Sequence, residues 1–308
     1  MTATTSPVAP TMLAVLGACA VAVSAQEPTF RAGTELVSLG VSVPDGDGGF
    51  VADLAIEDFE VLEDGRPQRV QYFARGFDGG EGPDLHVGLL FDTSGSMSDD
   101  IAMSRTAAIR FLDTLRQARD ITLVDFDTEV RVSRFEQDDF PRLVERIRTR
   151  RPRGYTAMYD ALGLYLNRAS HRRGRTILVV FTDGGDTSSA LRFDELLTAV
   201  RVSDVTIYTI GFLQNRSRAS WLHQRTELSE VASEGGGDAF FPLSMRQIDD
   251  AYETILAQLG AQYTLGYHPT NAAADGTWRD VDVRVLREDV EGKRIQARRG
   301  YFAPYRPE

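Results

Sequence analysis

The chain contains very little cysteine, lysine and histidine. Its 308 residues include one cysteine, Cys19, and one lysine, Lys293. Because Cys19 lies in an apolar N-terminal stretch, the rest of the chain can form no internal disulfide. Its four histidines are scattered and do not have the spacing of a zinc site. The fold must therefore be held by packing, and we expect neither a disulfide framework nor a zinc centre.

Positive charge and long apolar runs are also scarce. The formal net charge of −11 argues against a nucleic-acid partner. Residues 12–23 are apolar but too few to span a bilayer, and Val23-Ser24-Ala25 forms a small-residue cleavage pattern. We therefore predict a signal peptide over residues 1–25 and export to the periplasm, the cell envelope or the medium. A lipid anchor at Cys19 is the alternative, and we expect no transmembrane segment.

The sequence also lacks two common enzyme motifs. There is no Gly-x-Ser-x-Gly element, which argues against a hydrolase with a Ser-His-Asp triad. There is no glycine-rich loop ending in Gly-Lys, so a nucleotide-binding P-loop is not expected. These absences favour a binding protein over an enzyme of either class, and they leave its oligomeric state open.

What is present falls into three segments after the signal peptide. Residues 26–83 alternate between apolar and polar positions, as short β-strands do, with a hairpin signal at Asp64-Gly65. Residues 84–262 have the pattern of an α/β domain, and the pattern of short β-strands returns over residues 263–308. Since neither end has enough strands to bury a core alone, we expect both to combine into one sheet or sandwich, with the α/β domain inserted between them.

The central segment has the pattern of a doubly wound, mostly parallel sheet, which is a Rossmann-like architecture. The expected apolar strands are residues 85–91, 121–126, 176–182 and 205–212, and residues 129–135 read as an antiparallel edge strand. The expected helices are residues 99–116, 156–168, 193–201 and 245–259. Because parallel strands end at one edge, the loops that follow them should meet there.

Three of those loops carry oxygen-bearing side chains, namely Asp92, Ser94 and Ser96, then Thr156, then Asp183. Each could simply cap a helix. Ser94 and Ser96 are two residues apart, and in an extended loop we expect them to point the same way. Together, however, the three loops would bring two carboxylates within about 4–6 Å, where the repulsion is on the order of 1 kcal/mol in water and greater when buried. A dication between the carboxylates reverses that cost. The donors are all hard oxygens and few are charged, which favours Mg²⁺, with Mn²⁺ or Ca²⁺ as alternatives.

The order Asp92-x-Ser94-x-Ser96, Thr156 and Asp183-Gly184 resembles the metal-ion-dependent adhesion site (MIDAS) of von Willebrand factor type A (VWA) domains. The resemblance covers roughly residues 84–262. It implies that the serines and the threonine contact the metal directly or exchange with water, and that both aspartates act directly or through water. It also implies that an open metal position accepts an Asp or Glu side chain from a partner protein.

Two further features bear on this resemblance. Tyr155 stands where glycine commonly precedes the threonine, so the shape of that loop is not fixed by the resemblance. The flanking β segments further resemble exported VWA-related proteins of acidobacteria. Five arginines precede Thr156 and form either a solvated helix end or a positive collar for an acidic ligand; they are Arg146, Arg148, Arg150, Arg151 and Arg153.

We therefore predict a non-enzymatic, exported module that binds a partner protein through its metal. The resemblance also implies that the helix over residues 245–259 shifts when a ligand binds. One alternative is a hydrolase whose cation activates water, although the two aspartates are committed to the metal and no general base is evident. The other alternative is an envelope scaffold in which the metal is purely structural.

Overall fold

The computed structural model describes residues 36–46, 49–76, 84–115, 118–169, 174–214, 217–290 and 295–305. The predicted signal peptide and Cys19 lie outside these residues. No helix within the described ranges is both long and apolar enough to span a membrane. Residues Thr34–Glu308 form one compact unit.

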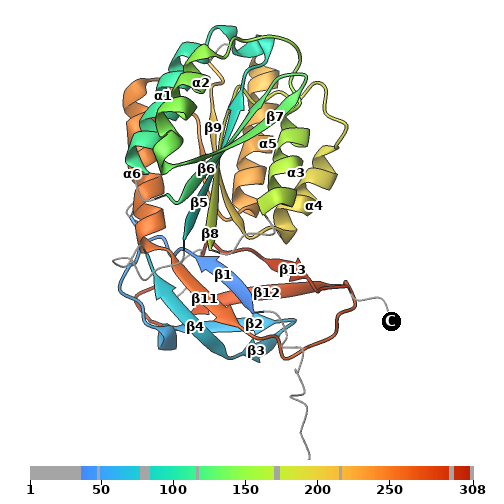
Figure 1. Ribbon diagram of the computed structural model, residues 1–308. Helices are drawn as coiled ribbons and strands as arrows, with labels where there is room; N and C mark the ends of the chain where they lie inside the picture. Colours follow the sequence, from blue (N-terminus) through green and yellow to red (C-terminus); the bar gives the residue numbers. More distant parts are fainter. Residues whose placement is uncertain are drawn as a thin grey trace, which may run out of the picture. The chain divides into compact units, whose positions relative to one another are not determined.

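The largest sheet of this unit has six strands in the order β10-β9-β8-β5-β6-β7 (Figure 1). Its strands are β5 (Leu85–Asp92), β6 (Asp120–Phe126), β7 (Val130–Glu136), β8 (Arg175–Thr182), β9 (Val205–Gly211) and β10 (Ala239–Phe240). Neighbouring strands run parallel except β7, which pairs antiparallel with β6 at the edge. The expected strands and the antiparallel edge are thus confirmed.

Six helices cover the two faces of this sheet (Figure 1). They are α1 (Ile101–Thr114), α2 (Phe140–Thr149), α3 (Met158–Ala169), α4 (Phe193–Val202), α5 (Arg218–Glu234) and α6 (Met245–Ala261). One buried core joins the sheet to α1, α2 and α6, and a second joins it to α3, α4 and α5. Burial on both faces explains why the central strands are apolar at most positions.

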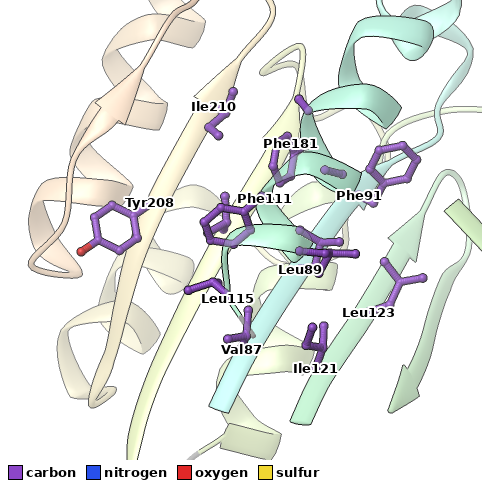
Figure 2. Packing of buried hydrophobic residues seen from close by; sticks show 14 of the residues in the cluster. Val87, Leu89, Phe91, Phe111, Leu115, Ile121, Leu123, Phe181, Tyr208 and Ile210 are labelled. Carbon is purple, nitrogen blue, oxygen red and sulfur yellow. The ribbon is translucent and has the colours of Figure 1, made fainter. Parts of the chain in front are cut away.

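Alternation along β5 sends successive side chains into the two cores. Val87, Leu89 and Phe91 belong to the core under α1, where Phe111 packs on the same side of the sheet (Figure 2). Leu90 points to the opposite core. Glycine at position 88 is required, because a Cβ there would lie 2.3 Å from the Tyr165 ring.

Two helices were not expected from the sequence. The helix α2 begins at Phe140 and continues to Thr149, so the arginine-rich segment before Thr156 is partly helical. The longer helix α5 lacks a continuous apolar stripe. Its residue Leu222 is 60% exposed, and the buried residues of the helix lie mainly near its C-terminal end. The start of α5 is nevertheless capped, because Ser217 Oγ accepts a hydrogen bond from the Ser220 N–H.

The N- and C-terminal β segments pair with each other in two antiparallel sheets. Their strands are β1 (Val37–Val41), β2 (Phe59–Glu63), β3 (Arg66–Gln68), β4 (Val70–Arg75), β11 (Tyr263–Tyr267), β12 (Trp278–Val285) and β13 (Gly300–Phe302). One sheet has the order β1-β11-β4 and the other β13-β12-β2-β3. Both sheets contribute to one buried core, for example through Leu39 and Tyr263 from the first and Val61 and Val283 from the second.

The hairpin between β2 and β3 turns at the predicted dipeptide. Asp64 has φ 48° and Gly65 has φ 75°, which suits a tight two-residue turn between twisted strands. The architecture is therefore an α/β fold with a mostly parallel sheet, accompanied by small antiparallel sheets from both chain ends. The limits of residues 26–83, 84–262 and 263–308 as separate domains stay predictions.

Candidate metal centre

Asp92 ends β5 and is completely buried. Its Oδ1 accepts a hydrogen bond of 2.8 Å from the Ser94 N–H, and its Oδ2 accepts one of 2.7 Å from the Thr182 hydroxyl. Thr182 lies at the end of β8, the strand beside β5. Both carboxylate oxygens are therefore oriented by the loop and by the neighbouring strand.

The two serines of the first loop lie together, but not for the expected reason. Ser94 Oγ and Ser96 Oγ are 3.0 Å apart. We expected an extended loop to point them the same way, whereas Ser94 is extended and Gly95–Ser98 forms a short 3₁₀ helix. The tighter turn brings hydroxyls two residues apart to one side, so the expected backbone was wrong although the two hydroxyls are close.

The loop that carries Thr156 is fastened to the first loop through its backbone. The Arg153 N–H donates to the Thr93 carbonyl at 2.9 Å, and the Gly95 N–H donates to the Gly154 carbonyl at 3.0 Å. Gly154 has φ +68°. The next N–H, that of Tyr155, donates to Thr128 Oγ1 at 2.8 Å. Gly154 thus supplies the left-handed backbone, and Tyr155 fits the loop with its side chain 69% exposed.

The third loop closes the arrangement after β8. Asp183 is buried, and the following Gly184 has φ +84° and donates its N–H to Thr182 Oγ1 at 3.0 Å. Thr156 joins this loop as well, because its N–H donates to Thr187 Oγ1 and its carbonyl accepts from the Thr187 N–H. The three predicted loops therefore form one hydrogen-bonded unit at the carboxyl edge of the sheet.

The charges of this unit are suited to a dication. Burial, followed by the charge of Asp183, raises the pKa of Asp92 from 3.8 to about 7. A pocket of about 310 Å³ is lined by Ser96, Thr156 and Asp183, together with Tyr155 and Gln224. Among the described residues, no three or more of His, Cys, Asp and Glu gather as a metal cluster. Asp183, Ser96 and Thr156 line the pocket, while Ser94 contacts Ser96 and Asp92 interacts with Asp183. These carboxylate and hydroxyl oxygens fit a hard, partly hydrated cation such as Mg²⁺.

Two neighbouring aspartates hold the loops through hydrogen bonds. Asp186 accepts the Tyr159 N–H at the start of α3 and two hydrogen bonds from Ser189. Asp127 accepts the Glu129 N–H at 2.9 Å, and its carbonyl accepts the Ala157 N–H. Both groups therefore support the backbone on either side of Thr156.

The arginines near this edge do not form a free collar. Asp125 is buried in β6 and binds Arg131, Arg146 and Arg150, with its oxygens 2.6–3.0 Å from the guanidinium nitrogens. Arg153 binds Asp127 at 3.2 Å. A buried carboxylate needs such partners, because leaving it unpaired is costly. Three of the five arginines, Arg146, Arg150 and Arg153, thus neutralise buried acids. For these three residues, both the solvated-helix and the free-collar interpretations were wrong.

Sequence reasoning missed Thr182, Thr128 and Gln224. The role of Thr182 could have been found from strand register, because the residue before Asp183 must lie beside Asp92 in a parallel pair. Gln224 gave no signal, since α5 itself was not expected. Thr128 is likewise visible only once the loop of residues 153–156 is folded back on it.

Comparison with protein families matches residues 86–254, more than half of the chain, to the von Willebrand factor type A domain. The matched range includes β5 to β10 and all five predicted metal-binding residues. No curated protein matches the chain.

Several solved structures also match. The von Willebrand factor type A protein from Catenulispora acidiphila is 13% identical, with 88% of this chain and 73% of that chain covered and a TM-score of 0.47. The vWF domain of the type V pili tip protein Mfa5 from Porphyromonas gingivalis is 13% identical, with coverages of 57% and 96% and a TM-score of 0.47. Proximal thread matrix protein 1 from the mussel byssus, with a zinc-occupied MIDAS motif, is 17% identical, with coverages of 58% and 48% and a TM-score of 0.46. These matches do not support the acidobacterial resemblance.

Proposed function

We propose, since the chain belongs to the von Willebrand factor type A domain family, that it is an exported, non-enzymatic module that binds a partner protein through a divalent cation. The observation that carries the proposal is the buried pair Asp92 and Asp183, of which Asp183 lines an open pocket together with Ser96 and Thr156. Burial and the charge of Asp183 disfavour the ionised form of Asp92, and a bound cation would remove that penalty.

Five side chains would hold the cation: Asp92, Ser94, Ser96, Thr156 and Asp183. Mg²⁺ is the expected ion, and Mn²⁺ or Ca²⁺ is compatible with the same oxygen donors. When bound, the ion supplies a positive charge and an exchangeable position for an outside oxygen ligand. An Asp or Glu side chain from a partner protein is the ligand that complements that charge.

The test is a titration of the purified protein with MgCl₂, followed by thermal unfolding and calorimetry. At a concentration 100 times Kd, the ion should raise the free energy of unfolding by about 2.7 kcal/mol. Asp92→Ala should remove this gain while leaving a folded protein. Asp113→Ala, which removes an exposed aspartate of α1, is the control and should keep it. If wild type takes up none of Mg²⁺, Mn²⁺ and Ca²⁺, the proposed function is wrong.

A linked proposal concerns α6, which leads directly into β11. We expect α6 to shift when a carboxylate ligand binds at the metal. Crystals grown with and without such a ligand would reveal the shift, and an unmoved helix would contradict it.

A further inference from the structure

The amide of Gln224 lies beside the metal pocket without a hydrogen bond to the described residues. Its Oε1 is buried and has no hydrogen-bond partner. Its Nε2 is close to the pocket wall, because a Cβ built on Gly185 would lie only 2.9 Å from it. The amide nitrogen makes no hydrogen bond to the described residues either, and it is the atom of this group that can donate to a carboxylate. Gln224 therefore places an unused N–H donor at the rim of the pocket, where a group from outside can accept its hydrogen bond.

The sequence makes room for Gln224 with two successive glycines. A Cβ on Gly184 would lie 2.9 Å from the Gln224 Cβ, and one on Gly185 would meet the amide nitrogen at the same distance. Gly184 also has φ +84°, which disfavours other residues. Any side chain at either position would push Gln224 away from the loop that carries Asp183. The glycine pair thus lets α5 approach the metal pocket.

Tyr155 lines the same pocket from the loop that carries Thr156. Its backbone is fixed by the hydrogen bond to Thr128, yet its side chain is 69% exposed. No partner for its hydroxyl is found among the residues that the structure describes. An immobilised backbone with an exposed ring offers apolar contact area at a low entropic cost.

Charge decides which acidic segments suit this pocket. The chain carries a formal net charge of −11, and three of the five arginines near the pocket are paired with Asp125 or Asp127. A run of acidic residues would meet net repulsion once its first carboxylate had bound. A segment with a single acidic residue and an apolar neighbour avoids that repulsion, and its apolar side chain can pack on the Tyr155 ring.

We propose that Gln224 and Tyr155 select the ligand segment. The Gln224 amide donates a hydrogen bond to the carboxylate oxygen that does not bind the metal, and the Tyr155 ring packs on an apolar side chain beside the acid. The ligand is therefore a protein segment with one Asp or Glu flanked by aliphatic or aromatic residues. This inference rests on the proposed function, because the carboxylate must first bind the cation.

Three synthetic heptapeptides in saturating MgCl₂ provide the test, with binding to the full chain measured by calorimetry. Each peptide has a central glutamate, flanked by leucine and phenylalanine, by two serines, or by two further glutamates. The variants are Gln224→Leu and Tyr155→Ser. Their controls are Thr226→Ala, an exposed residue of α5 outside the pocket, and Tyr305→Ala, a tyrosine that is 72% exposed and does not line it.

Wild type should bind the apolar-flanked peptide at least about tenfold more tightly than the other two, which corresponds to one good contact. Gln224→Leu should weaken all three peptides about tenfold, the loss expected for a hydrogen bond to a charged group. Tyr155→Ser should abolish the preference over the serine-flanked peptide, whereas the glutamate-flanked peptide should still bind more weakly because of charge repulsion. Neither variant should change Mg²⁺ affinity, whereas a general disturbance of the site would lower it.

Two failures can be told apart. If the peptides bind with Mg²⁺ but with equal affinity, or if both variants behave like their controls, the inference is wrong and the proposed function stands. If Mg²⁺ does not bind, or if no peptide requires it, the proposed function itself fails and the inference falls with it.

Discussion

Gly154 is the residue whose replacement should best separate loop geometry from metal chemistry. It contributes no atom to the predicted ligand set, yet it shapes the backbone two residues before Thr156. Its φ of +68° disfavours an L-residue, and a Cβ on it would lie 2.5 Å from Thr128 Oγ1. Gly154→Ala should therefore destabilise the fold for two separable reasons and also displace Thr156.

The size of each effect follows from the structure. Placing alanine in the left-handed region costs roughly 1–2 kcal/mol, and forcing extra atoms into a filled space costs roughly 1–3 kcal/mol. Gly154→Ala should thus lower the free energy of unfolding by about 2–5 kcal/mol. Gly65→Ala is the matched control, because Gly65 has φ +75° and nothing within 4 Å of its Cβ position. Gly65→Ala should lower the free energy of unfolding only by the cost of the left-handed backbone, roughly 1–2 kcal/mol.

Urea unfolding in EDTA measures both variants without metal, and calorimetry with MgCl₂ then measures affinity. Gly154→Ala should bind Mg²⁺ more weakly, whereas Gly65→Ala should bind it as wild type does. Thr128→Ala should cost less stability in Gly154→Ala than in wild type, because in that background the hydroxyl that accepts the Tyr155 N–H also clashes with the new methyl group. Equal stability and equal Mg²⁺ affinity of the two glycine variants would refute the claim that this loop positions Thr156.

Three further predictions concern residues outside the metal set. Asp125→Ala should cost up to about 3–5 kcal/mol, because it removes a fully buried carboxylate that pairs with three partly buried arginines, whereas Asp282→Ala, at an exposed ion pair, should cost less than about 1 kcal/mol in the same urea assay. The Asp275 carboxyl should titrate by NMR with a pKa of about 2, because the Thr277 N–H and hydroxyl and then Arg279 stabilise its charge. Arg279→Ala should raise that pKa, and the contribution of Asp275 to stability should be lost as pH falls from about 4 towards 2. Gly88→Ala should prevent a tyrosine ring of α3 from packing on β5, which circular dichroism and thermal unfolding would detect as severe destabilisation.

The sheet could be predicted because its strands obey a simple rule. A parallel strand covered on both faces must be apolar throughout, and residues 85–91 and 176–182 meet that requirement in every position but one or two. The antiparallel strand β7 could also be predicted, because its apolar and polar residues alternate and it follows β6 after a short turn. The helix α5 escaped prediction because its first half is exposed and carries no apolar stripe, so its position depends on tertiary contacts.

The loops could be predicted in composition but not in conformation. The oxygen donors after β5 and β8 were visible in the sequence, whereas the 3₁₀ turn at Gly95–Ser98 was not. The sequence showed a cluster of arginines before Thr156, but it did not show which acidic residues they pair with. Their pairing with Asp125 depends on β6 and α2 lying side by side, and only the folded chain shows this arrangement.

Strand register explains why distant aspartates come together at one edge. In the parallel pair β5 and β8, Leu90 lies opposite Val180 and Phe91 lies opposite Phe181. The next step along both strands places Asp92 beside Thr182, whose hydroxyl donates to it at 2.7 Å. Asp183 follows Thr182 directly, and its charge raises the pKa of Asp92. A shift of one residue in either strand would break the hydrogen bond and turn each side chain to the opposite face. The packed sheet therefore imposes the electrostatic conflict that a bound cation would relieve.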